Sequence, residues 1–188
     1  MRFFYYLDIL FKKVQKNCTF FFTFVENKGI IVVNSGSKWG KVVKMFIGEY
    51  QHNLDAKGRI IVPSKFREEL HTTFILARGL DTCLTIYSLK QWEKLFEEVN
   101  KLPTTKKATR LYSRMLTATA SECTLDNQGR IQVPSFLSKP VNINKECVII
   151  GANDHIEIWD KDTWETYYND ASNNFEEVAE SLNDLLND

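Results

Sequence analysis

The amino-acid sequence predicts an α+β fold made of two tandem, pseudo-symmetric β units packed with helices. The main observation is a ten-residue pattern, Leu-Asp-x-x-Gly-Arg-Ile-x-Val-Pro, which occurs at residues 54–63 and again at residues 125–134. A second pair of similar segments, residues 84–92 and 156–164, follows at nearly the same offset, 72 residues against 71. Agreement at two places along the chain indicates an internal duplication, and amphipathic helical patterns follow each copy.

In each copy, the ten-residue pattern describes a strand, a turn and a return strand. The leucine ends the first strand, and the aspartate opens the turn, where its carboxylate can accept hydrogen bonds from backbone N–H groups. The glycine supplies the positive φ of a tight turn, the arginine begins the return strand, and the proline suits the start of a helix. The turn residues are Asp55, Lys57, Gly58 and Arg59 in the first copy and Asp126, Gln128, Gly129 and Arg130 in the second.

Two further strands complete each unit. Short apolar runs rich in β-branched and aromatic residues, bounded by turn residues, are typical of strands. The predicted strands are residues 74–77, 84–87, 148–151 and 156–159, and the turns between them are residues 79–81 and 153–154.

Helices are predicted after both units. Ser88 and Gln91 form a capping box for a helix with one apolar face. Residues 104–115 continue with a second apolar stripe beside several basic residues, and residues 164–171 predict another helix. The tail, residues 175–186, is amphipathic and acidic, and we expect its apolar stripe to dock on its own fold. The apolar positions are Trp92, Leu95, Phe96 and Val99, then Ala108, Leu111, Tyr112 and Met115, and finally Trp164, Tyr167, Tyr168 and Ala171.

The first 44 residues differ from the rest of the chain. They contain seven of the 13 phenylalanines and show neither a strand pattern nor an amphipathic period, whereas the regular pattern begins at Met45. We expect this segment to be upstream, non-coding sequence translated from a wrongly chosen start. The alternative is a genuine N-terminal extension that is disordered or associated with a membrane.

These patterns divide the chain into five segments. We expect an extension at residues 1–44, a first repeat at 45–91, a helical connector at 92–119, a second repeat at 120–163 and a helical tail at 164–188.

Composition excludes several functional classes. Hydrophobic residues make up 44% and charged residues 26% of the 188 residues, as in ordinary globular proteins, and the formal net charge is zero. Residues 1–44 carry eight bases and two acids, so the remainder is acidic and can bind DNA only where its bases cluster. No apolar run reaches the ~20 residues of a transmembrane helix, and residues 18–25 do not lead to an export cleavage site.

Metal chemistry and catalysis are also not expected. Cysteines and histidines are widely spaced, without the paired spacings of a zinc site, so we expect reduced cysteines that fill apolar sites in a cytosolic protein. The sequence predicts no cofactor, no small-molecule substrate and no enzyme, because no nucleophile, base or phosphate loop can be identified. The residues concerned are Cys18, Cys83, Cys123, Cys147, His52, His71 and His155.

The two Asp-x-x-x-Arg turns, their prolines and the Met-Phe-Ile-Gly-Glu-Tyr start at residues 45–50 resemble the MraZ family over residues 45–188. The resemblance implies two SpoVT-AbrB-like swapped-hairpin units packed with helices. It also implies a ring-like homo-oligomer that binds double-stranded DNA at direct repeats upstream of its own start. Such a protein usually represses its own operon of division and cell-wall genes, and we expect a cytoplasmic, nucleoid-associated location.

Carried over by position, the turn residues of both repeats become the DNA-binding candidates: Asp55, Lys57, Gly58, Arg59, Asp126, Gly129 and Arg130. An arginine on a rigid hairpin can fork onto guanine O6 and N7, and a turn lysine suits a phosphate. Because Gln128 replaces the lysine in the second turn, we expect the two turns to contribute unequally. The alternative from the residues alone is that each Asp–Arg pair is a local ion pair that fixes the hairpin or an oligomer interface.

The codons of residues 35–43, just before Met45, can contain a repeated DNA sequence. They allow three copies of AGTGG about 10 bases apart, close to one turn of B-DNA. Each copy offers two neighbouring guanines to an arginine. We therefore expect residues 35–43 to be a translated operator.

A second functional hypothesis remains open. The chain resembles, less closely, AbrB-type antitoxins and general DNA-binding proteins of that fold, with the C-terminal tail capturing a protein partner. Such antitoxins usually carry one hairpin unit, whereas this chain carries two.

Overall fold

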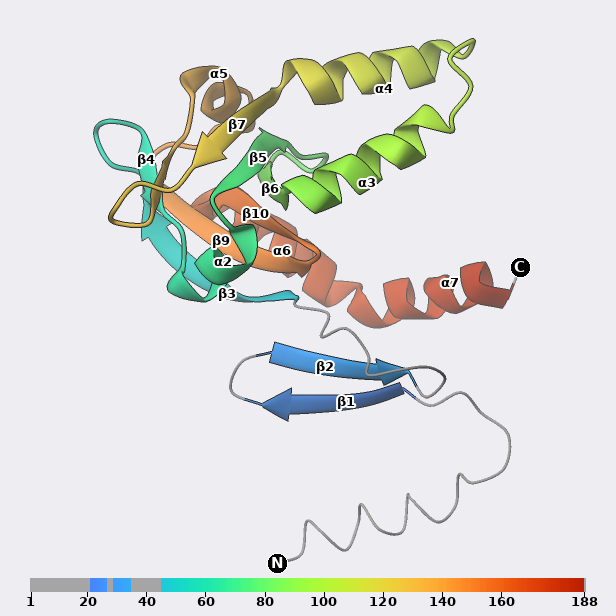
Figure 1. Cartoon of the computed structure of the whole chain (residues 1–188). Helices are drawn as coiled ribbons and strands as arrows, with labels where there is room; N and C mark the ends of the chain where they lie inside the picture. Colours follow the sequence, from blue (N-terminus) through green and yellow to red (C-terminus); the bar gives the residue numbers. More distant parts are fainter. Residues whose placement is uncertain (1–20, 27–28, 35–44, 188) are drawn as a thin grey trace, which may run out of the picture. The chain divides into compact units, whose positions relative to one another are not determined.

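The computed structural model describes residues 21–26, 29–34 and 45–187, and the chain divides into two compact units, Met1–Met45 and Phe46–Asp188. In the first unit, strand β1 (Phe21–Glu26) pairs antiparallel with β2 (Gly29–Asn34) (Figure 1). The expectation of no strand pattern before Met45 is therefore wrong for these two segments, which are rich in the aromatic and β-branched residues that strands favour. Residues 35–43, the proposed translated operator, lie outside the described residues.

The second unit contains the two repeats, and each runs through the same order of elements (Figure 1). The first repeat comprises β3 (Phe46–Asn53), β4 (Arg59–Ile61), α2 (Ser64–Leu70), β5 (Thr73–Arg78), β6 (Leu84–Ser88), α3 (Leu89–Asn100) and α4 (Lys107–Ala118). The second comprises β7 (Ala120–Thr124), β8 (Arg130–Gln132), α5 (Ser135–Ser138), η1 (Lys139–Val141), β9 (Glu146–Asn153), β10 (His155–Asp160), α6 (Lys161–Asn173) and α7 (Phe175–Asn187). All strands and helices predicted from residue 45 onwards are present.

The strands of the two repeats are exchanged. The six-stranded sheet has the order β3-β9-β10-β6-β5-β7, and β4 and β8 form a separate antiparallel pair. The first strand of each repeat pairs with the third strand of the other, since β3 lies beside β9 and β7 lies beside β5. This order reads the same when the repeats are interchanged, so the predicted α+β fold of two swapped, pseudo-symmetric units is confirmed.

A pseudo-twofold axis that relates the two repeats passes between β4 and β8 and between β6 and β10. Ile60 pairs with Ile131 across β4 and β8, and Thr85 pairs with Glu157 across β6 and β10. In each case, the two residues occupy equivalent positions in the two repeats. Each repeat therefore needs strands of the other repeat to complete the six-stranded sheet.

The core lies between the sheet, the β4–β8 pair and the short helices. Phe66 of α2 is buried and packs edge-on against both Phe46 and Tyr50 of β3. Full burial of such a side chain contributes about 1.5–3 kcal/mol. Other fully buried side chains come from both repeats: Ile60, Leu70, Phe74, Leu76, Leu84, Ile86, Ile131, Leu137, Ile149, Ile156 and Trp159.

The thiols of Cys83 and Cys147 lie in this interior and are not paired in a disulfide. Burial raises the pKa of Cys83 to about 12 and that of Cys147 to about 11. Both positions are buried, as the sequence predicted for cysteines that fill interior sites.

The long helices pack less completely than the sequence patterns suggest. Ser88 caps α3, because its Oγ accepts a hydrogen bond from the Gln91 N–H at 3.3 Å. On α4, however, Leu111 is 59% exposed and Met115 is 45% exposed. In the part of the structure described, no helix has the length and apolar content needed to cross a membrane.

The expectation that the C-terminal tail docks on its own fold is wrong for the side chains described in α7. Phe175 is 70% exposed and Val178 is 52% exposed. The physical reason is the direction of the helix: Figure 1 shows that α7 continues beyond α6 and away from the sheet, and Phe175 and Val178 remain exposed there.

Candidate nucleic-acid interface

The first turn is built around the carboxylate of Asp55. Its Oδ1 accepts the backbone N–H groups of Lys57 and Arg59, both at 2.9 Å. The backbone closes the turn as well, with the Asp55 N–H donating to the Arg59 carbonyl and the Gly58 N–H donating to the Asp55 carbonyl, each at 2.8 Å. Gly58 has a φ of 72°, as the sequence predicted.

The second oxygen of Asp55 holds the side chain of Arg59. Arg59 Nε donates to Asp55 Oδ2 at 2.8 Å, and Arg59 Nη2 lies 2.6 Å from the same oxygen. The hydrogen bond from Arg59 lowers the pKa of Asp55 to about 2, and the same contact raises the pKa of Arg59. Both groups are therefore charged at neutral pH.

The second turn repeats this arrangement. Asp126 Oδ1 accepts the N–H groups of Gln128 at 2.8 Å and Arg130 at 3.0 Å. Arg130 Nε donates to Asp126 Oδ2 at 2.8 Å, and Nη2 lies 2.7 Å from that oxygen. The pKa of Asp126 is lowered to about 2 by the hydrogen bond from Arg130, and Gly129 has a φ of 73°. The local ion pairs considered from the sequence are thus present in both turns.

The ion pairs leave part of each guanidinium available. A guanidinium has five N–H donors in a plane, and the carboxylate takes those on the edge formed by Nε and Nη2. The end formed by Nη1 and the outer N–H of Nη2 remains, and it has the spacing needed for two acceptors. With one edge held by the aspartate, the orientation of each arginine side chain is fixed. Arg59 and Arg130 keep 28% and 22% of their side-chain surface exposed.

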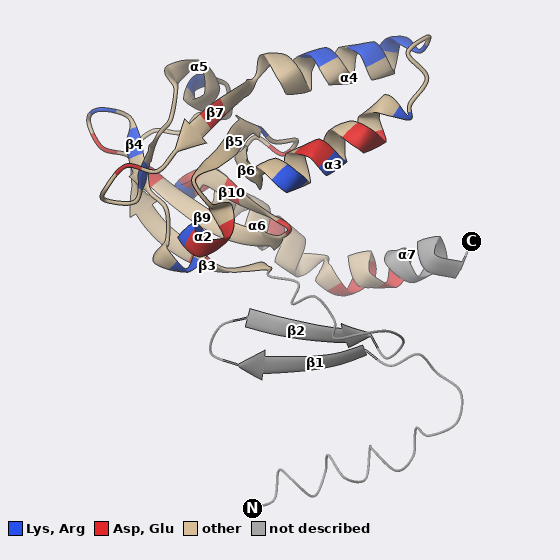
Figure 2. Cartoon of the chain, viewed as in Figure 1, with Lys and Arg blue, Asp and Glu red and all other residues tan. Residues whose placement is uncertain are grey.

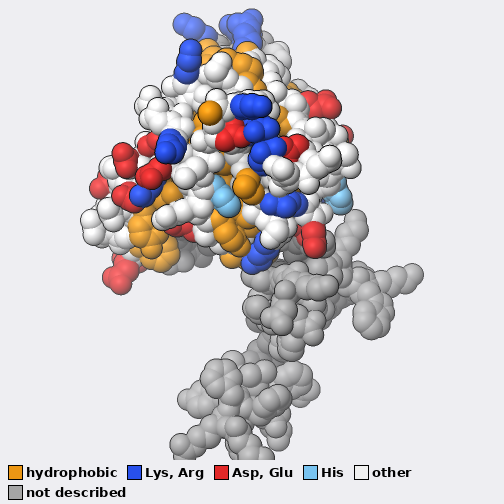
Figure 3. Space-filling model, turned by 90° about the vertical axis from the view of Figure 1, so that its left-hand side faces the viewer, with side chains coloured by type: hydrophobic (Ala, Val, Ile, Leu, Met, Phe, Trp, Pro, Cys, Tyr) orange, Lys and Arg blue, Asp and Glu red, His pale blue; other side chains and the backbone are white. Residues whose placement is uncertain are grey.

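The two turns lie on the same side of the unit, at opposite ends of the β4–β8 pair (Figure 1). Backbone bonds extend the pair into each turn, because Val62 N–H donates to Gly129 O at 2.9 Å and Val133 N–H donates to Gly58 O at 2.8 Å. This side faces the viewer in Figure 3, where Lys and Arg side chains run down the middle of the surface with acidic side chains beside them. Tertiary pairing therefore brings together two turns that are 71 residues apart in the sequence.

Comparison with known protein families identifies the repeats. The model of the MraZ protein, a family described as antitoxin-like, matches residues 45–115 and again residues 116–186. The chain belongs to the MraZ family. MraZ proteins are DNA-binding regulators and not enzymes. The resemblance stated from the sequence is thus confirmed, and each MraZ repeat contains one Asp–Arg turn.

Sequence reasoning missed two residues that contact the turns of the MraZ repeats. Gln132 of β8 reaches the first turn, where its Nε2 donates to Lys57 O at 2.8 Å and to Gly58 O at 3.1 Å. Arg67 of α2 lies against Gly129 in the second turn. Both contacts cross between repeats. The only sequence signal is that the equivalent residues, Ile61 and Ser138, are of a different type.

Charge is also distributed unevenly over the long helices of the two MraZ repeats (Figure 2). Helix α4 carries Lys107, Arg110 and Arg114, and no acidic residue occurs between residues 101 and 119. Helix α7 is acidic in its first turn and has no basic residue. Equivalent ends of the two repeats therefore have opposite charge.

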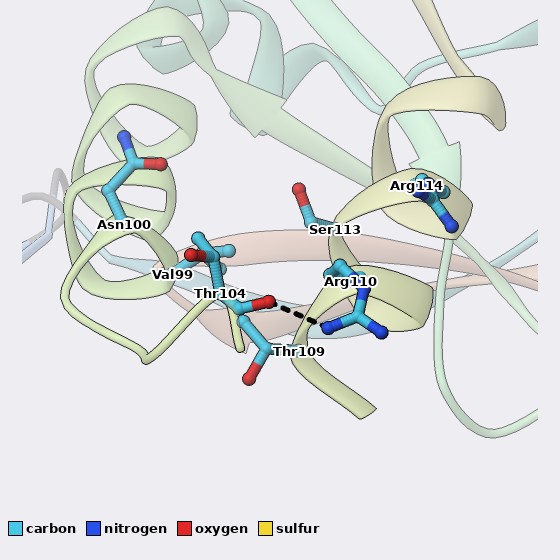
Figure 4. Close-up of a pocket in the computed structure, with 7 residues that line it drawn as sticks. All are labelled: Val99, Asn100, Thr104, Thr109, Arg110, Ser113 and Arg114. Carbon is cyan, nitrogen blue, oxygen red and sulfur yellow. Dashed lines mark hydrogen bonds between the residues drawn. The ribbon is translucent and has the colours of Figure 1, made fainter. Parts of the chain in front are cut away.

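Two further polar sites lie away from the turns. Between α3 and α4, Arg110 Nη1 donates to the carbonyls of Thr104 at 2.8 Å and Thr105 at 2.7 Å, which ties the interhelical loop to α4 (Figure 4). On β10, His155 lies 2.8 Å from an Asp154 oxygen and 3.3 Å from a Glu157 oxygen, and the bond to Glu157 raises the pKa of His155. Among the described residues, no group of His, Cys, Asp and Glu forms a candidate metal site.

Proposed function

We propose that this chain is a sequence-specific DNA-binding transcriptional regulator that represses its own operon of division and cell-wall genes. It binds direct repeats upstream of its own start, in the cytoplasm and at the nucleoid, without cofactor, membrane or small-molecule substrate. The observation that carries the proposal is the pair of identically built turns on one side of the molecule. Each turn presents an arginine held by an aspartate.

The residues of each turn have distinct roles in this proposal. Arg59 and Arg130 read guanines through their outer N–H groups, because this end of a guanidinium matches O6 and N7 in the major groove. Asp55 and Asp126 orient the arginines. Gly58 and Gly129 allow the turn conformation, and Lys57 neutralises a phosphate.

The active form is a ring-like homo-oligomer in this proposal, because two short turns give a small footprint for tight, specific binding. In this oligomer, the exposed face of α4 contacts the acidic α6–α7 end of a second copy. The basic face of α4 exposes Leu111 and Met115, and the acidic α7 exposes Phe175 and Val178, so charge and apolar surface are complementary. Because the two surfaces differ, the contact is head to tail and closes into a ring when its rotation allows.

Oligomer formation is tested by light scattering with charge-reversed chains. Arg114→Glu and Glu177→Lys should each lower the average mass at micromolar concentration, and the two variants mixed should recover it. Lys90→Glu, on the exposed surface of α3, is the control. A wild-type chain that is monomeric at these concentrations contradicts the proposal.

DNA binding is tested with a duplex taken from the chain's own gene across codons 35–43, compared with a shuffled duplex of equal composition. Arg59→Ala and Arg130→Ala should each weaken specific binding by roughly 5- to 140-fold, the equivalent of about 1–3 kcal/mol for a bidentate base contact. Lys57→Ala should weaken both duplexes alike and flatten the salt dependence. Wild-type affinity in both arginine variants would reject the role of these arginines in reading bases. Lys90→Ala, on α3, is the control and should bind like wild type.

The second candidate is an AbrB-type antitoxin or a general DNA-binding protein whose tail captures a protein partner. The antitoxin-like description of the family and the exposed Phe175 and Val178 favour it. Equal affinity for the operator duplex and the shuffled duplex, at all salt concentrations, would support this function over the first.

A further inference from the structure

The two turns differ in their basic residues. The first turn has Lys57 beside Arg59, whereas the second has Gln128 beside Arg130. From the sequence alone, the second turn therefore lacks a second cation beside its arginine, and the two turns are expected to contribute unequally. The surroundings of the second turn in the structure change this expectation.

Arg67 of α2, in the first repeat, lies against the second turn. A methyl group on Gly129 would overlap the guanidinium of Arg67, including its Nε, Cζ and Nη1 atoms. The position of the Arg67 side chain is fixed by a hydrogen bond from its Nε to the carbonyl of Val62 at 2.7 Å. The Val62 N–H in turn donates to Gly129 O at 2.9 Å. Helix α2, the end of β4 and the second turn are thus joined at one place.

The pseudo-twofold relation gives the first turn no such arginine. The residue equivalent to Arg67 in the second repeat is Ser138. The nearest atom to a methyl group on Gly58 is instead the neutral Nε2 of Gln132, at 3.1 Å. Each turn therefore has two cations in reach: Lys57 and Arg59 at the first, and Arg67 and Arg130 at the second.

The Arg67 charge remains effective at this position. Arg67 is half-buried, and its charge contributes, after burial, to the lowered pKa of His52. Glu68 follows it directly in α2, and side chains one residue apart do not face each other on a helix.

We propose that Arg67 is a further DNA-contacting residue, which supplies the phosphate-neutralising charge that Gln128 does not provide. This inference rests on the proposed DNA-binding function. Arg67 acts from outside the turn, across the boundary between the repeats, and leaves Arg130 for the bases. The two turns then contribute about equally to the electrostatic part of binding, contrary to the sequence-based expectation.

The test is the salt dependence of binding to the operator duplex. Arg67→Gln removes the charge but keeps an amide that can donate to the Val62 carbonyl, whereas Arg67→Lys keeps the charge. The slope of log K against log salt concentration should fall in Arg67→Gln by about 0.9 for each subunit bound to the duplex, the amount for one phosphate that is no longer neutralised, and stay near wild type in Arg67→Lys. Lys90→Gln, which removes the same charge from α3, should leave the slope unchanged.

A rescue variant separates charge from structure. Adding Gln128→Lys to Arg67→Gln places the cation inside the turn, as at Lys57, and should restore the slope without restoring the Arg67 contact with Gly129. An unchanged slope in Arg67→Gln, or a lowered slope that Gln128→Lys does not restore, overturns the inference while the proposed function stands. Failure of the wild-type chain to bind the operator duplex in preference to the shuffled one overturns the proposed function, and the inference with it.

Discussion

Ile60 and Ile131 occupy equivalent positions in the two repeats, pair directly across β4 and β8, and are both completely buried. The two Asp–Arg turns extend from opposite ends of the β4–β8 strand pair. The spacing of the turns therefore depends on the short β4–β8 pairing between the repeats, with these two isoleucines at its centre.

Shortening either isoleucine should destabilise the protein by a similar amount. Ile60→Val and Ile131→Val should each lower the free energy of unfolding by about 0.5–1.5 kcal/mol, because each removes one buried methylene. Urea unfolding measures the effect, and Ile61→Val, at a position that is 42% exposed, is the control. A cost at only one of the two positions would contradict their equivalence.

Acid should disrupt the turns at an unusually low pH. Since the pKa of Asp55 and of Asp126 is lowered from 3.8 to about 2, the carboxylates stabilise the fold above pH ~4, and this contribution is lost as the pH falls through 2. The amide signals of Lys57 and Gln128, whose N–H groups bond these carboxylates, should shift with a midpoint near pH 2. Midpoints close to the ordinary aspartate pKa of 3.8 in an NMR titration would show that the ion pairs do not persist in solution.

The two turn glycines should tolerate alanine differently. Both have positive φ, which costs a residue with a Cβ about 1–2 kcal/mol, but only Gly129 is in contact with a guanidinium. Gly129→Ala should therefore lower the free energy of unfolding more than Gly58→Ala. Combining Gly129→Ala with Arg67→Ala should remove part of the difference, since the overlapping group is gone. Equal costs in thermal unfolding would contradict the contact.

A chain that begins at Met45 should fold and bind DNA as well as the full chain. The family match begins at residue 45, and residues from Phe46 onwards form one compact unit. Circular dichroism and binding to the operator duplex measure the two properties. Loss of folding without residues 1–44 would show that they are part of the structure.

The nucleotide sequence of the gene tests the translated-operator prediction directly, because a TCN codon for Ser35 or an AAA codon for Lys38 breaks the predicted AGTGG repeat.

Local structure was readable from the sequence because it depends on neighbouring residues. The Asp-x-x-Gly-Arg spacing specified the turns down to the positive φ of Gly58 and Gly129, and Ser88 and Gln91 located the start of α3. The duplication was equally visible, because it preserves residue type at a constant offset. These features require no knowledge of the rest of the fold.

Only the tertiary structure decided how the repeats meet. The exchange of strands that pairs Ile60 with Ile131 is not encoded in any local spacing, because pairing depends on which apolar faces can be buried together. The same exchange brings Arg67 to Gly129 and Gln132 to Gly58, across the boundary between the repeats. The sequence thus determined which residues form each turn. The packing of one repeat against the other determined which charges surround it.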